Sequence, residues 1–217
     1  MSRHPDLASR LALIVVTDER LPPGRDLVDI VRAALRGGAR AIQLRDKART
    51  PRASVAIARA LLAETRAAGA LLFVNDRVDV ALAAGADGAH LGDDDLPLAA
   101  ARRIVPPGFL LGRSASTPEL AMDAELEGAD YVGVGPIHAT ATKLDAGDAV
   151  GTARIAAVAR SVRIPIVGIG GITAGNAPAV ITAGAAGIAV VSAVMSASDP
   201  EAATRQLLVS VQSSVLL

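Results

Sequence analysis

Polar and charged side chains of this 217-residue chain recur directly after short apolar runs. Gln43, Arg45 and Lys47 alternate after one such run, so they face the same side if the chain stays extended. An amide beside two cations suits an anionic substrate such as a diphosphate, because Arg and Lys form charge-assisted hydrogen bonds to phosphate oxygens. The alternative is that Arg45 and Lys47 are solvated loop charges.

Carboxylates follow the next two apolar runs. Asp76 stands directly at the end of one run, and residues 93–95 are three aspartates that follow His90 in the next. Carboxylates on neighbouring strand ends can share a hard divalent cation, since Mg²⁺ takes one or two protein carboxylates and fills its other positions with water and substrate phosphate. Asp76 is the best placed of these residues, whereas the run 93–95 alone is also typical of a loop that caps a helix.

The later runs are followed by groups that suit phosphate. Ser114 is placed either to bond a phosphate oxygen or to cap a turn. The longest irregular segment, 135–151, carries Thr140, Thr142 and Lys143, and a long loop with these residues can close over a phosphate. The last two runs end in Gly170-Gly171 and in Val191-Ser192, where backbone N–H groups can approach a second phosphate.

The three histidines give little support for acid–base catalysis. His4 lies near the first residue, His90 is interpreted as a packed or hydrogen-bonded core residue, and His138 in the long loop either touches a substrate or is exposed. No Ser-His-Asp spacing and no HExxH element occur.

Strand-length apolar runs alternate with helix-length segments along the chain, which is the pattern of βα units. The expected strands are 11–17, 41–44, 71–74, 88–91, 110–112, 131–134, 166–169 and 187–191. The expected helices are 26–36, 52–68, 77–84, 98–104, 118–127, 154–161, 174–183 and 200–212. Thr117-Pro118 and Asp199-Pro200 each predict an N-cap followed by proline in the first helical turn.

A weak internal repeat supports the same count. Gly38, Gly85, Gly128 and Gly184 each stand between a helix and a strand, where glycine can end a helix in the left-handed conformation. Eight units of roughly 27 residues predict an α/β protein, a single (β/α)₈ TIM barrel over residues 1–217, with 1–10 as a frayed tail. The competing doubly wound sheet often has a glycine-rich turn after its first strand, and residues 18–24 contain no GxGxxG.

Composition excludes several classes of protein. Lys and Arg total 22 and so do Asp and Glu, which argues against a nucleic-acid partner. The absence of cysteine excludes disulfides, a thiolate nucleophile and cysteine-ligated zinc. The charge-free residues 177–198 are too rich in Ala and Gly for a membrane span, and the first residues lack a secretion signal. We expect a cytoplasmic protein with small-molecule partners and no membrane or nucleic-acid partner, and the sequence leaves a homo-oligomer open.

Six strings of the sequence follow one another at the expected strand ends. The strings are QLRDK at 43–47, NDRVD at 75–79, ADGAHLG at 86–92, GVGPI at 133–137, TATK at 140–143 and GIGGI at 168–172. Each string is weak alone, but their joint order at strand ends is specific. On these strings, the chain resembles thiamine-phosphate synthases from about residue 14 to residue 195.

The resemblance implies a reaction and a set of roles. The reaction joins 4-amino-2-methyl-5-hydroxymethylpyrimidine diphosphate to 4-methyl-5-(2-hydroxyethyl)thiazole phosphate by a dissociative, Mg²⁺-assisted substitution. Thiamine monophosphate and pyrophosphate are the products. By position, Gln43, Arg45, Lys47, Asn75, Ser114 and Lys143 would hold the pyrimidine diphosphate, with Arg45, Lys47 and Lys143 catalytic; Asp76 and Asp95 would bind Mg²⁺; Thr140, Thr142, Gly171, Val191 and Ser192 would hold the thiazole phosphate.

Departures from the family pattern bear on loop packing and thiazole contacts. Ser116 stands where the family commonly has histidine, His138-Ala139 where it has an aromatic residue and proline, and Asp93 where it has glutamine. A related barrel, the thiazole tautomerase, uses a histidine in the loop after strand six, so His138 makes that activity the nearest alternative. A tautomerase has no pyrophosphate to bind, which argues against it.

Two more distant readings stay open. A sugar-phosphate isomerase or aldolase would want a Lys or carboxylate base at a strand end, and the two lysines, Lys47 and Lys143, both lie beyond strand ends. A non-catalytic ligand-binding regulator could keep the fold, but the intact carboxylates argue against it.

Overall fold

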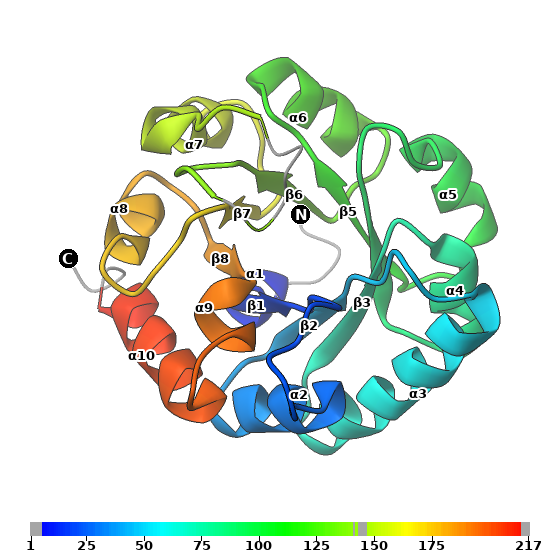
Figure 1. Ribbon diagram of the computed structural model, residues 1–217. Coiled ribbons are helices and arrows are strands. Elements are labelled where there is room, and N and C mark those ends of the chain that lie inside the picture. Colours follow the sequence, from blue (N-terminus) through cyan, green and yellow to red (C-terminus); the bar gives the residue numbers. More distant parts are fainter. Residues whose placement is uncertain (1–5, 141, 143–146, 214–217) are drawn as a thin grey trace.

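The eight strands form one closed parallel barrel (Figure 1). The computed structural model describes residues 6–140, 142 and 147–213. Each strand pairs with the next in sequence, and β1 pairs with β8 to close the sheet. The strands are β1 Leu13–Val16, β2 Ala41–Leu44, β3 Leu71–Asn75, β4 Gly88–Leu91, β5 Leu110–Ser114, β6 Tyr131–Val134, β7 Ile166–Ile169 and β8 Gly187–Val190. The prediction of a (β/α)₈ barrel is confirmed.

Helices surround the barrel and bury their apolar faces against it (Figure 1). The eight expected helices are present, shifted at their ends by up to a few residues, and two short helices were not expected. The helices are α1 Leu7–Arg10, α2 Leu27–Arg36, α3 Pro51–Ala67, α4 Val78–Ala84, α5 Leu98–Ile104, α6 Pro118–Leu126, α7 Gly151–Ala159, α8 Ala177–Thr182, α9 Ser192–Met195 and α10 Pro200–Gln212. Within the described ranges, no helix is long and apolar enough to cross a bilayer.

The expectation of a frayed tail over 1–10 is wrong for its second half. Residues 7–10 form α1, and Leu7 and Leu11 are buried among the side chains that fill the barrel. Two leucines four residues apart lie on one face of a helical turn, so they enter the barrel together. Residues 1–5 lie outside the described part of the chain.

Local signals in the sequence have the expected effect. The Thr117 hydroxyl accepts the Leu120 N–H, and the Asp199 carboxylate accepts the Ala202 N–H, so both residues cap helices that begin with proline. All four repeat glycines have positive φ, between 77° and 109°, where a side chain would be strained.

Two of these glycines, Gly85 and Gly128, are each followed two residues later by an aspartate that connects neighbouring strands. The carboxylates of Asp87 and Asp130 accept the N–H groups of Leu72 and Leu111, each on the preceding strand. Asp130 also pairs with Arg102 at 2.6 Å, and both side chains are largely buried. These contacts stabilise the amino-terminal edge of the barrel.

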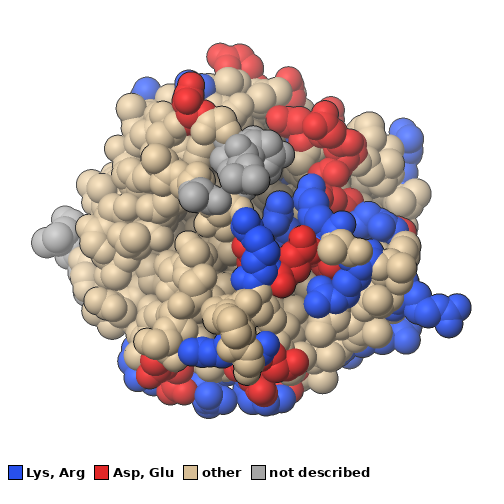
Figure 2. Space-filling view, viewed as in Figure 1, with Lys and Arg blue, Asp and Glu red and all other residues tan. Residues whose placement is uncertain are grey.

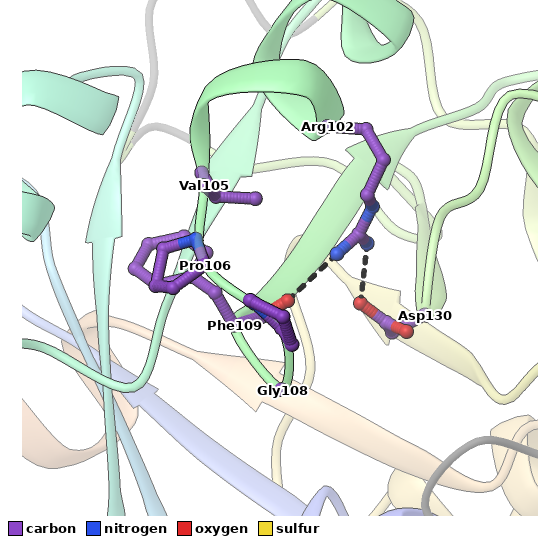
Figure 3. Close-up of a pocket in the computed structure, with 7 residues that line it drawn as sticks. Arg102, Val105, Pro106, Gly108, Phe109 and Asp130 are labelled. Carbon is purple, nitrogen blue, oxygen red and sulfur yellow. Dashed lines mark hydrogen bonds and ion pairs between the residues drawn. The ribbon is translucent and has the colours of Figure 1, made fainter.

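A cavity of about 330 Å³ adjoins this ion pair (Figure 3). The Arg102 guanidinium also donates to the carbonyls of Phe109 and Gly128. The cavity lies at the amino-terminal ends of β5 and β6, away from the face where such barrels carry their catalytic groups. Its two charged residues, Arg102 and Asp130, bind each other and the backbone of the barrel, so we assign the cavity no catalytic role. It is lined by Arg102, Val105, Pro106, Pro107, Gly108, Phe109 and Asp130.

Two aromatic rings fill the barrel where the strands carry glycine. Phe73 and Tyr131 pack edge to face, with ring centroids 5.4 Å apart. A Cβ on Gly112 would lie 2.2 Å from the Tyr131 ring, so only glycine leaves room for this tyrosine.

We predict that Gly112→Ala lowers the free energy of unfolding by about 1–3 kcal/mol, because the added methyl group overpacks the interior and pushes Tyr131 aside. Denaturant unfolding measures this change. Gly175→Ala is the matched control, since a Cβ there meets its nearest neighbour at 3.8 Å and the residue has no positive φ. Equal stability of the two variants would contradict the packing argument.

Candidate active site

Charged side chains gather on one side of the barrel mouth, the face formed by the carboxyl ends of the strands. In the view of Figure 2, Lys, Arg, Asp and Glu crowd the side over β2, β3 and β4, while the side over β7 and β8 is largely uncharged. Catalytic groups of such barrels lie at this face. The mouth therefore divides into a charged half and a neutral half.

Two amides meet across β2 and β3 inside the charged half. Gln43 is buried, and its Nε2 donates to Asn75 Oδ1 at 2.7 Å. With that bond made, Gln43 keeps a carbonyl oxygen and Asn75 keeps an N–H₂ group for another partner. The pair can thus offer one acceptor and one donor to a ligand.

The loop after β1 holds the loop after β2. The Thr17 hydroxyl accepts the Arg45 N–H at 3.0 Å, and the Glu19 carboxylate accepts the N–H groups of Lys47 and Ala48. These bonds fix the backbone that carries two cations. The Lys47 side chain is half exposed, and its ammonium lies 3.2 Å from Asp76 Oδ2.

Asp76 and Asp95 come together although they follow different strands. Asp76 has φ 64°, a left-handed conformation that aspartate tolerates better than most residues, and its N–H donates to the His90 carbonyl at 2.8 Å. Asp95 accepts the Gly92 N–H at 2.6 Å. Burial, and then the neighbouring Asp95 carboxylate, raise the pKa of Asp76, against the opposing effect of Lys47.

A carboxylate pair that is unfavourable alone is suited to a cation. Among the described residues, no three His, Cys, Asp or Glu side chains form a metal-holding group. A pair of carboxylates alone would suit a cation such as Mg²⁺ that takes its other ligands from water and substrate phosphate.

A hydrogen-bonded chain runs from the barrel interior to the mouth. The Tyr131 hydroxyl lies 3.0 Å from His90 Nδ1, and His90 Nε2 lies 3.1 Å from Ser114 Oγ. Burial, and then the nearby Arg113, lower the pKa of His90 to about 4, so the imidazole is neutral at pH 7. His90 is a hydrogen-bonded core residue, as the sequence suggested.

The neutral half contains the residues expected to bind the second phosphate. The hydroxyls of Thr142 and Ser192 lie 3.4 Å apart, and the Thr142 N–H donates to Thr140 Oγ1. Gly170 and Gly171 both have positive φ. The loops after β6, β7 and β8 thus converge on one place.

Glycine is required at 171 because the long loop passes over it. A Cβ on Gly171 would lie 2.6 Å from the Ala139 carbonyl and 2.8 Å from His138 Cβ. His138 is partly buried, and its Nε2 has no described partner. Val191 directly precedes α9. Lys143, expected to hold the diphosphate, lies outside the described residues.

Two features of the site were not expected from the sequence. Arg20 pairs with Asp18 at 2.8 Å and also donates to the Thr142 carbonyl, so it links the loop after β1 to the loop after β6. The Arg20 guanidinium holds the pKa of Asp18 below its usual value. Arg113 pairs with Asp93 and donates to the Gly92 carbonyl. In the sequence, the only sign of these contacts was that charged residues follow the strands.

Comparisons with known proteins bear on the family of the chain. The family model of thiamine monophosphate synthase matches residues 13–194. The thiamine-phosphate synthase of Roseiflexus castenholzii is 54% identical over 203 residues, which cover 94% of this chain and 89% of that protein. That of Methanoculleus marisnigri is 52% identical over 195 residues, 90% of this chain and 92% of the relative.

A solved structure shares the whole barrel. The thiamine phosphate pyrophosphorylase from Pyrococcus furiosus superimposes with a TM-score of 0.88 at 43% identity, and the match covers 96% of this chain and 99% of that one. From the sequence match and the shared fold together, we conclude that the chain belongs to the thiamine-phosphate synthase family, a family of transferases.

Proposed function

We propose that this protein condenses 4-amino-2-methyl-5-hydroxymethylpyrimidine diphosphate with 4-methyl-5-(2-hydroxyethyl)thiazole phosphate and releases pyrophosphate. The observation that supports this most is the meeting of Lys47, Asp76 and Asp95 at the mouth. A cation beside two carboxylates is suited to a diphosphate that arrives with Mg²⁺, and the thiazole tautomerase has no pyrophosphate to bind.

The charged half of the mouth would bind the pyrimidine diphosphate. The free acceptor of Gln43 and the free donor of Asn75 match an aminopyrimidine, which offers an N–H donor and a ring-nitrogen acceptor. Arg45 and Lys47 would bind the diphosphate oxygens, with the Ser114 hydroxyl donating from the opposite side. Lys143 is proposed for the same group from its sequence position alone.

Asp76 and Asp95 would hold Mg²⁺. When bound, the ion would neutralise part of the diphosphate charge and so make the diphosphate a better leaving group. Hard carboxylate oxygens are the donors that Mg²⁺ prefers. Burial, and then the neighbouring Asp95 carboxylate, raise the pKa of Asp76, and a bound cation would offset both effects.

The neutral half would bind the thiazole phosphate. Thr140, Thr142 and Ser192 offer hydroxyl donors, while Gly171 and Val191 offer backbone next to α9, where barrels of this kind bind phosphate. Holding the phosphate there would set the distance and direction from which the thiazole nitrogen reaches the pyrimidine.

The proposed chemistry needs no nucleophile from the protein. The bond between the pyrimidine methylene carbon and the diphosphate oxygen breaks, and its electron pair leaves with the diphosphate. The thiazole nitrogen then donates its lone pair to that carbon. Arg45 and Lys47 stabilise the charge that develops on the leaving oxygen, and the two half-sites supply proximity.

A direct assay tests the proposal. The protein is incubated with both substrates and Mg²⁺, and thiamine monophosphate and pyrophosphate are measured. We expect both products in equal amounts, and none after chelation of the metal. If the pyrimidine diphosphate is not consumed while a thiazole phosphate precursor isomerises, the tautomerase alternative is correct, and His138 with its unpartnered Nε2 becomes the candidate base.

Asp76→Asn should abolish metal binding without destabilising the fold. Asparagine has the same shape and tolerates the same positive φ, so we expect an unchanged or higher thermal midpoint without metal. The stabilisation by Mg²⁺ should disappear, and kcat should fall at least about 100-fold, since a metal ion supplies several kcal/mol of charge stabilisation. Calorimetry and the product assay measure these effects.

The matched control is Asp94→Asn, an exposed aspartate in the same acidic run. Its Mg²⁺ response and kcat should equal those of the unmodified protein. A full Mg²⁺ response in Asp76→Asn would remove Asp76 from the proposed metal site.

Lys47→Met should reduce the rate of bond breaking more than it weakens binding. The methionine keeps most of the apolar stem but removes the cation, so we expect kcat to fall about 10–1000-fold with a smaller rise in KM. Steady-state kinetics with varied pyrimidine diphosphate give both constants. Arg52→Met, which removes an exposed cation from α3, serves as the control, and equal losses in the two variants would exclude a specific role for Lys47.

A further inference from the structure

The chain Tyr131, His90 and Ser114 connects a fully buried hydroxyl to one at the mouth. Tyr131 is 1% exposed, and its hydroxyl lies over Gly112, where no side chain intervenes. The His90 imidazole lies against Gly133, where a Cβ would come within 3.0 Å of its Cε1. Glycine on β5 and on β6 therefore lets both rings occupy fixed places.

The buried phenol decides the direction of the hydrogen bonds. A phenol has one proton to donate, and leaving it without an acceptor inside the barrel is costly. Among the described residues, His90 Nδ1 is the acceptor within reach of the Tyr131 hydroxyl. The hydroxyl must then donate to Nδ1, so Nδ1 carries no proton.

The unprotonated Nδ1 of His90 in turn determines the hydrogen bond between His90 and Ser114. A neutral imidazole with Nδ1 unprotonated carries its proton on Nε2. The Nε2–H then donates to Ser114 Oγ across 3.1 Å. Because the serine oxygen accepts that bond, its own proton is free to donate elsewhere.

We propose that Tyr131 and His90 are positioning residues, which keep the Ser114 hydroxyl as a hydrogen-bond donor aimed at an anionic oxygen in the mouth. The opposite order would have Ser114 donate inward to His90, and the serine would then present only lone pairs, which repel a diphosphate. The inference deepens the proposed function and rests on it only for the identity of the anion.

The tautomer of His90 tests the inference without any turnover. Nitrogen NMR of the free protein, with ¹⁵N in the histidine rings, distinguishes a proton on Nε2 from one on Nδ1. His4→Gln and His138→Gln assign the other two histidine signals. We expect a neutral ring at pH 7 with its proton on Nε2, and a proton on Nδ1 would overturn the inference whether or not the protein makes thiamine monophosphate.

Binding of inorganic pyrophosphate with Mg²⁺, followed by calorimetry, tests the consequence at the mouth. Tyr131→Phe keeps the ring against Phe73 but removes the proton, so Nδ1 can take up the imidazole proton and Ser114 can turn inward. We expect affinity to fall about tenfold in Tyr131→Phe and in Ser114→Ala, with no further loss in the double variant, because both act through one hydroxyl.

A pair of His90 variants separates positioning from packing. His90→Gln places an amide donor near the position of Nε2 and should stay within about threefold of the unmodified affinity. His90→Leu fills the space without a donor and should lose about tenfold. Additive losses in the Tyr131 and Ser114 double variant, or equal affinities of the two His90 variants, would contradict the inference.

Discussion

The pairing of β1 with β8 is the constraint on which the rest of the structure depends. Leu13 lies opposite Ile188 and closes the sheet, so all eight parallel strands end at one mouth. Side chains far apart in sequence meet there as a result. Arg20 and the Thr142 carbonyl, 122 residues apart, form one hydrogen bond across the mouth. Beneath them, Leu7 and Leu11 fill the other end of the barrel.

The closed barrel also explains how a chain with no net charge can bind an anion. The 22 cationic and 22 anionic side chains cancel over the whole molecule, but at the mouth side chains of both signs gather on one half (Figure 2). Lys47 balances Asp76 only in part, because burial, and then the Asp95 carboxylate beside it, raise the pKa of Asp76. The protein keeps a carboxylate pair that is unfavourable without a ligand, which is typical of a site selected for binding.

The fold was predictable because its signals are local, whereas contacts across the mouth depend on distances that no sequence pattern contains. The apolar runs located all eight strands, and four glycines placed between helices and strands supported the count. All four glycines have positive φ in the structure. Strand ends also located the polar residues that meet. The helix α1 was missed because a single turn has too few residues to show periodicity. The partners of His90, Tyr131 and Ser114, were missed because these contacts depend on distances between side chains of three different strands.

We propose above that Asp76, Asp95 and Lys47 form a metal–diphosphate site at the mouth. A crystal structure with Mn²⁺ and inorganic pyrophosphate tests it most directly, since the anomalous signal of manganese locates the ion without assumptions about the protein. We expect one ion bound by Asp76 and Asp95 and shared with pyrophosphate oxygens that contact Lys47. An ion that binds away from both carboxylates, or pyrophosphate bound at the cavity beside Arg102, would contradict it.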